Sequence, residues 1–158
     1  MSAVIELRRT DLDSDAAQHL INALNAELTA LYPEEGVNYF RLDAEDVRPG
    51  RGAFFVAYVA GAPVGCGAVR LLDRHTAEIK RMYVAPEMRR QGVARRLLEA
   101  LEREARLLAV TRILLETGTR QPEAIALYLR GGFSATTPFG EYKGSPLNTF
   151  MEKQVGGG

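Results

Sequence analysis

The chain has 158 residues, a length that fits one domain with a single core. Hydrophobic residues make up 46% and charged residues 25% of it, the balance of a globular protein and not of a disordered or fibrous one. Lysine plus arginine equals aspartate plus glutamate at 20 each, so no net charge favours nucleic acid or an anionic membrane as the main partner.

Cysteine and histidine usage narrows the chemistry further. The single cysteine, Cys66, excludes an internal disulfide and a thiolate metal site. His19 and His75 are isolated, whereas a metal site needs three or four converging ligands, so neither predicts one. Residues 1–9 lack the basic and apolar runs of a signal peptide, and no apolar run reaches the roughly 18 residues of a membrane span. We therefore expect a cytoplasmic protein without a metal.

The amino-terminal third predicts a strand and a helix. Residues 4–9 form a short apolar run, and Thr10 or Asp11 offers a helix cap after it. Residues 13–31 then predict an amphipathic helix, because apolar side chains recur at helical spacing. Residues 32–52, which contain two prolines and several glycines, predict an irregular, mobile segment with a short helical turn at 43–47.

The middle of the chain predicts a meander of three strands. Residues 53–60 and 64–72 are rich in valine, phenylalanine and tyrosine, and Gly61-Ala62-Pro63 between them is typical of a hairpin. Residues 77–84 predict the third strand.

After Pro86 the period of the pattern changes. Residues 92–109 predict a long amphipathic helix, 112–117 a strand, and 122–130 a short helix that stops at Gly131-Gly132. Residues 133–136 and 147–153 predict two closing strands around the loop 138–146. This order indicates one mixed α/β domain over 1–155, with a right-handed crossover at its centre and a flexible tail at 156–158.

A predicted anion site lies at that crossover. The strand 77–84 runs through a turn with Arg89, Arg90 and Gly92 directly into the long helix. A glycine-containing turn at a helix amino terminus presents unpaired backbone N–H groups and the positive end of the helix dipole. A P-loop ending and a G-x-G-x-x-G run are both absent, so coenzyme A suits this turn better than a nucleotide. The alternative is that Gly92 only starts a helix.

Two motifs here resemble those of one family. Arg89-x-x-Gly92-x-Ala94, after Met82-Tyr83-Val84-Ala85-Pro86, is similar to the pyrophosphate motif of the GNAT superfamily of N-acetyltransferases. Leu115-Glu116-Thr117, then Gln121-x-x-Ala124-x-x-Leu127-Tyr128-x-x-x-Gly132-Phe133, resembles its second motif. The likeness covers about 64–153. It implies a mixed, mostly antiparallel central sheet with a splayed parallel strand pair and flanking helices.

The resemblance also implies how acetyl-CoA would bind. Backbone groups of Met82 and Val84 would hold the pantetheine arm as an added strand. The pyrophosphate would lie on the turn formed by Arg89, Arg90, Gln91, Gly92, Val93 and Ala94. Gln121 stands where the family usually has an asparagine that touches pantetheine, which leaves that contact open.

Two residues match catalytic positions of the family. Tyr128 matches the tyrosine that protonates the leaving thiolate, and the alternative is an aromatic residue that only packs. Glu78 matches the glutamate that some members use as the general base for the ammonium group, and the alternative is an ion pair of Glu78 with Lys80 or Arg81.

The residues that would bind the acceptor amine match no motif. Arg81 or Arg70 could bind an acceptor carboxylate, with solvated or salt-bridged arginines as the alternative, and Tyr32 and Phe139 belong to the segments 32–52 and 138–146 that would shape the pocket. We expect a small amine such as an amino acid or related metabolite. A non-catalytic acyl-CoA-binding module, acetylation of a protein N-terminus or lysine, and a homodimer stay open.

Overall fold

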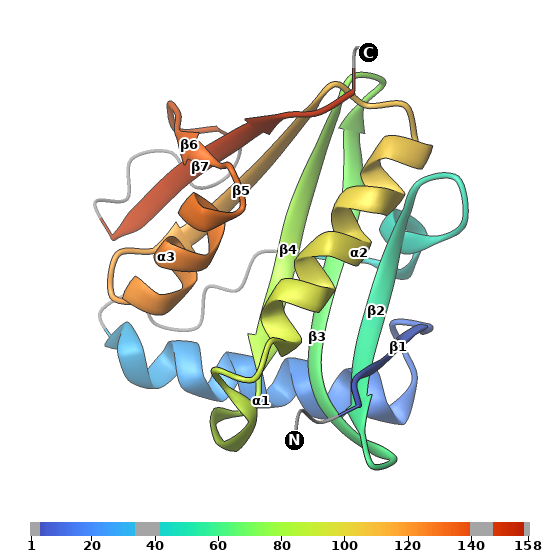
Figure 1. Ribbon diagram of the computed structural model, residues 1–158, viewed down its shortest axis with the longest axis vertical. Coiled ribbons are helices and arrows are strands. Elements are labelled where there is room, and N and C mark those ends of the chain that lie inside the picture. Colours follow the sequence, from blue (N-terminus) through green and yellow to red (C-terminus); the bar gives the residue numbers. More distant parts are fainter. Residues whose placement is uncertain (1–3, 34–41, 140–146, 157–158) are drawn as a thin grey trace.

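The computed structural model describes residues 4–33, 42–139 and 147–156. Within this part of the chain, seven strands form one sheet in the order β1-β2-β3-β4-β5-β7-β6 (Figure 1). The strands are β1 (Glu6–Arg9), β2 (Gly52–Val59), β3 (Ala62–Asp73), β4 (Thr76–Val84), β5 (Arg112–Gly118), β6 (Ser134–Ala135) and β7 (Asn148–Gln154). The helices are α1 (Asp15–Leu31), α2 (Val93–Leu107) and α3 (Pro122–Arg130), with 3₁₀ turns η2 (Ala44–Val47) and η3 (Pro86–Met88).

The sheet is mixed, as the sequence predicts. Strands β4 and β5 are parallel and are joined by the crossover through α2, whereas the other neighbouring strands of this sheet are antiparallel. The predicted fold class, a mostly antiparallel sheet with one parallel pair and flanking helices, is therefore confirmed.

Helices cover both faces of the sheet. On one face, Leu98 and Leu101 of α2 pack on Val69 and Ile79 in the largest apolar cluster. On the other face, Leu20 of α1 and its neighbours pack on β2 and β3 in a second cluster. Strand side chains alternate between the two faces, so β2 and most of β3 are buried on both sides and read as nearly continuous apolar runs. β4 is largely buried as well, but it carries the charged residues Glu78, Lys80 and Arg81.

The start of α1 differs from the prediction. The cap is Ser14 and not Thr10 or Asp11: Ser14 has an extended backbone, and its hydroxyl accepts a hydrogen bond from the N–H of Ala17 at 3.2 Å. A short hydroxyl at this position satisfies one of the unpaired N–H groups of the first turn. The helix consequently begins at Asp15.

The two segments expected to be irregular are described only in part. Residues 34–41 and 140–146 lie outside the described residues, as do 157–158 of the expected tail. The predicted turn near 43–47 is η2, which ends in the buried Val47 and is tied to β3 by an ion pair between Asp46 and Arg70 (3.5 Å). The extent of the domain, 1–155, stays a prediction.

Candidate active site

The site begins where β4 and β5 separate. Their last paired residues are Ile79 and Leu115; beyond these, β4 stays with β3 and β5 stays with β7. A cavity of about 1600 Å³ opens between the two arms. Side chains from α1, β4, α2, β5 and α3 line it, so every layer of the fold reaches the cavity.

A bulge in β4 shapes one wall. Cys66 pairs with Tyr83 and Ala68 with Lys80, so two residues of β4, Arg81 and Met82, stand opposite one residue of β3. Arg81 takes a positive φ of 59°, and its guanidinium donates to the Asn25 side chain of α1 at 3.1 Å. A bulge beside a site re-aims a side chain, and here it turns Arg81 towards α1 while Met82 joins the apolar side.

The turn into α2 has the geometry of an anion cradle. Gly92 is the amino-terminal cap of α2 with φ 89°, and no side chain caps the helix. A Cβ at Gly92 would meet no atom within 4 Å, so the backbone there is open to the cavity that Gly92, Val93 and Ala94 line. The first N–H groups of a 15-residue helix thus face a space without a side chain to fill it.

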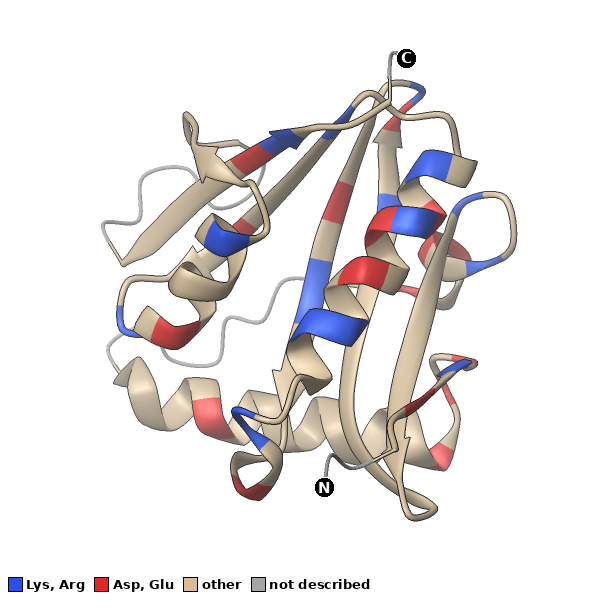
Figure 2. Ribbon diagram, viewed as in Figure 1, with Lys and Arg blue, Asp and Glu red and all other residues tan. Residues whose placement is uncertain are grey.

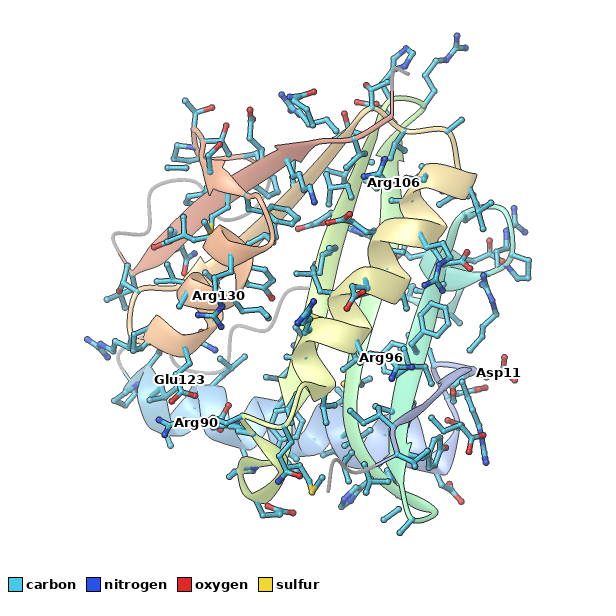
Figure 3. All side chains as sticks on the ribbon, in the orientation of Figure 1. Asp11, Arg90, Arg96, Arg106, Glu123 and Arg130 are labelled. Carbon is cyan, nitrogen blue, oxygen red and sulfur yellow. The ribbon has the colours of Figure 1, made fainter. Side chains whose placement is uncertain are left out.

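The two arginines of this turn are arranged differently. Arg89 is turned back: its Nε donates to the Val84 carbonyl (2.9 Å), its Nη2 pairs with Glu27 of α1 (2.5 Å), and it lies 5.9 Å from the Tyr83 ring centre. Arg90 pairs with Glu123 of α3 at 2.8 Å, across the mouth of the cavity (Figure 3).

Gln91 lies apart from these groups. Its side chain is exposed, its amide donates to the Glu87 carbonyl at 3.4 Å, and it does not line the cavity. Its expected contact with the pyrophosphate stays a prediction.

The opposite wall is a turn between β5 and α3 on which Tyr32 sits. The Arg120 N–H donates to the Tyr32 hydroxyl at 2.9 Å, and the Arg120 guanidinium donates to the Leu31 carbonyl at 2.7 Å. A Cβ at Gly118 would overlap the Tyr32 hydroxyl, so only glycine allows this close approach. Gln121 also serves this turn, because its Oε1 accepts from the Gly118 N–H at 3.1 Å and lies 3.5 Å from the Tyr32 hydroxyl.

Tyr128 of α3 faces the same cavity. The side chain is 5% exposed, and its ring meets that of Phe133 edge to face at 5.8 Å. Burial, and then the negative charge of Glu116, raises the pKa of the Tyr128 phenol. The phenol is therefore a neutral O–H donor at working pH, as a general acid must be.

Glu78 does not line the cavity. It is 1% exposed, and its Oε1 receives both Nε and Nη2 of Arg70 at 3.1 Å each. The alternative expected for Glu78 was an ion pair with Lys80 or Arg81. In the structure Glu78 forms an ion pair with Arg70, because strand register places Arg70 directly opposite Glu78.

The remaining predicted acceptor residues separate into two groups. Tyr32 and Arg81 line the cavity, whereas Arg70 and Phe139 do not. Phe139 packs edge to face on Phe150 of β7, with ring centres 5.5 Å apart.

Sequence reasoning missed several lining residues. Glu27, Lys80, Glu116 and Arg120 all reach the cavity. Glu116 could have been found, since it stands inside the second motif at the end of an apolar run. Glu27 could not, because its role depends on a partner 62 residues away.

Within 4–33, 42–139 and 147–156, no group of three or more histidine, cysteine, aspartate or glutamate residues could hold a metal ion. No helix in the same ranges is long and apolar enough to cross a membrane.

Comparison with known proteins agrees with this geometry. The family model described as "Acetyltransferase (GNAT) family" matches residues 17–133. A relative named IAA acetyltransferase, from Azospirillum brasilense, is 43% identical over 142 residues, which cover 89% of this chain and 92% of that protein.

Solved structures share the fold. A Klebsiella pneumoniae protein assigned to the acyl-CoA N-acyltransferases has a TM-score of 0.81 at 33% identity, over 97% of this chain and 99% of that one. A GNAT family acetyltransferase from Elizabethkingia anophelis, solved with acetyl-CoA bound, has a TM-score of 0.67 at 18% identity, over 96% of this chain and 98% of that one. The chain belongs to the GNAT family of acetyltransferases.

Proposed function

We propose that this protein transfers the acetyl group of acetyl-CoA to the amine of a small molecule, by direct attack of the amine on the thioester. The observation that carries the proposal is one cavity that joins the open amino terminus of α2 to the buried phenol of Tyr128. Acetyl-CoA, when bound, supplies an activated acetyl thioester. The Elizabethkingia neighbour with acetyl-CoA bound supports the choice of donor.

The donor would be held by the turn before α2 and by β4. Backbone N–H groups of Gly92, Val93 and Ala94 would bind the pyrophosphate, and Arg90 would add charge after leaving Glu123. Met82 and Val84 line the cavity on an edge of β4 that no strand of the described sheet covers beyond Ile79. Backbone groups of that edge would hold the pantetheine and polarise the carbonyl.

Tyr128 would act as the acid. As the C–N bond forms and the C–S bond breaks, the thiolate takes the phenolic proton, and one proton is released overall for each ammonium acetylated. For the base, the motif names Glu78, which could act only through water because it lies behind the cavity wall. If it does, Glu78→Gln should flatten the acidic limb of the pH–rate profile.

An assay of thiol release tests the proposal. Purified protein is given acetyl-CoA with each amino acid and a set of short alkylamines, and free thiol is measured; release with at least one amine is expected. Calorimetry with coenzyme A runs in parallel. Binding without release by any amine, peptide or protein would instead support a non-catalytic acyl-CoA-binding module.

A further inference from the structure

Direct removal of a proton from the ammonium group needs a carboxylate that reaches the amine, and Glu78 is badly placed for this. The Arg70 guanidinium binds the Oε1 of Glu78 through Nε and Nη2. The Glu78 side chain is almost fully buried and does not line the cavity. Another carboxylate, Glu116 of β5, does line the cavity and is partly exposed.

Strand register places Glu116 at the point where the cavity begins. Ile79 and Leu115, the last residues of the β4–β5 pair, both lie in the apolar cluster beneath α2 and α3. Because neighbouring residues of a strand point to opposite faces, Lys80 and Glu116 lie at the next positions on the other face. Glu116 is thus the first residue of β5 beyond the pairing. Figure 2 shows acidic and basic positions following one another along the middle of β4.

Glu116 also acts on the proposed acid. Its charge contributes to the raised pKa of Tyr128, so carboxylate and phenol are within electrostatic reach although they come from different elements. The cavity is lined by further charged side chains of both signs, which come from every element around it: Glu27, Lys80, Arg81, Arg89, Arg90, Arg95, Glu99, Glu102, Arg120, Glu123, Arg130 and Lys153. A thioester bound where the strands separate would lie between the face that carries the phenol and the face that carries the carboxylate.

We propose that Glu116, rather than Glu78, is the catalytic base that takes the proton from the acceptor ammonium. This rests on the proposed acetyl transfer. A carboxylate oxygen of Glu116 takes one proton from the ammonium nitrogen, whose freed electron pair forms the C–N bond. The C–S bond breaks as Tyr128 gives its proton to the sulfur. The nitrogen then loses its second proton, which restores the phenol, and the proton on Glu116 leaves to water. Glu78 and Arg70 then hold the strand in place.

Two substitutions of equal chemistry decide between the carboxylates. Glu116→Gln and Glu78→Gln are compared with Glu6→Gln, an exposed strand glutamate of β1 far from the cavity. For the amine that gives the fastest thiol release, kcat/KM is measured from low to high pH, and coenzyme A affinity is measured by calorimetry.

Glu116→Gln should lower kcat/KM at neutral pH roughly 100- to 1000-fold, the scale of lost general base catalysis. The loss should shrink as rising pH deprotonates the amine without help, while coenzyme A affinity stays within about twofold. Glu78→Gln should cost less than about tenfold. Added formate should restore part of the activity of Glu116→Ala, which a purely structural role would not allow.

The outcomes separate the two proposals. A Glu116→Gln profile that matches the wild type, or a larger loss in Glu78→Gln, overturns the role of Glu116 and leaves acetyl transfer intact. Absence of thiol release by the wild type with every amine overturns both. If Glu116→Gln is unfolded by circular dichroism, the formate experiment on Glu116→Ala and the Glu78→Gln profile decide.

Discussion

At the scale of single residues, the proposed chemistry depends on a neutral phenol held in an apolar wall. Tyr128 contacts Phe133 and lies among the buried residues beneath α2. Burial raises its pKa, which favours the protonated form, so the phenol should stay protonated over the whole range in which an enzyme works. No alkaline limb below about pH 10 should then come from this residue.

Replacing that hydroxyl should affect chemistry and not binding. We expect Tyr128→Phe to keep the ring contact with Phe133 and the affinity for coenzyme A, but to lower kcat roughly 10- to 1000-fold. Steady-state kinetics and calorimetry measure the two effects separately. A kcat equal to that of the wild type would make Tyr128 a packing residue.

Gly92 tests the anion cradle. Because its Cβ position is open, Gly92→Asp would place a carboxylate where the pyrophosphate is expected, and the rise in melting temperature on adding acetyl-CoA should be lost. Gly92→Asn is the matched control, since asparagine has nearly the same size, tolerates a positive φ and carries no charge. Equal stabilisation of both variants by acetyl-CoA would exclude the turn as the phosphate site.

At the scale of elements, α1 connects the two arms of the cavity. Through Glu27 it holds Arg89 of the turn before α2, and one helical turn later Leu31 and Tyr32 hold Arg120 of the β5–α3 turn. Figure 1 shows the helix passing below both β4 and α3. The helix therefore fixes the width of the cavity between the arms before any ligand binds, which lowers the cost of binding.

The bond between Glu27 and Arg89 can be tested alone. Glu27→Gln should weaken coenzyme A binding roughly two- to tenfold, since an ion pair at this exposure contributes on the order of 1 kcal/mol or less. Glu104→Gln is the control, because Glu104 forms an ion pair with Arg9 (2.6 Å) and does not line the cavity. Equal affinities in both variants, measured by calorimetry, would show that α1 does not preorganise the turn.

Local patterns predicted the elements better than their mutual contacts. The bounds of α3 followed from a proline at its start and glycines at its end, and the β2–β3–β4 meander followed from its apolar runs. The cap of α1 was predicted at Thr10 or Asp11 but lies at Ser14, because all three are residue types that cap helices. The Glu27–Arg89 pair joins residues far apart in sequence, so only packing of the whole chain reveals it.

The same limit applies to the site. The motif predicted lining positions such as Gly92 and Tyr128, since these depend on a local turn and a local helix. It could not show that the pairing of β4 with β5 stops one residue before Glu116, or that Arg70 forms an ion pair with Glu78. Both facts depend on strand register, which single sequences specify weakly for strands buried on both faces.

At the scale of the whole molecule, charge and the cavity wall bear on the acceptor. A balanced charge gives no long-range attraction for basic protein tails. Tyr32 and Arg81 both line the cavity, Tyr32 against the β5–α3 turn and Arg81 towards α1, so the cavity wall offers an aromatic ring and a cation. A compact amine with a carboxylate suits such a wall.

We therefore expect free amino acids or related small amines to be acetylated with higher kcat/KM than basic peptides or intact proteins. Competition in one tube, with acetyl-CoA, an amino acid mixture and a lysine-rich peptide followed by mass spectrometry, measures the preference directly. Arg81→Gln should raise KM for a carboxylate-bearing amine roughly tenfold or more, and should change KM much less for the corresponding amine without the carboxylate, because only the first would lose a charged partner. Faster acetylation of the peptide than of every small amine would instead assign the acceptor to a protein N-terminus or lysine, and Arg81 to the structure of the bulge alone.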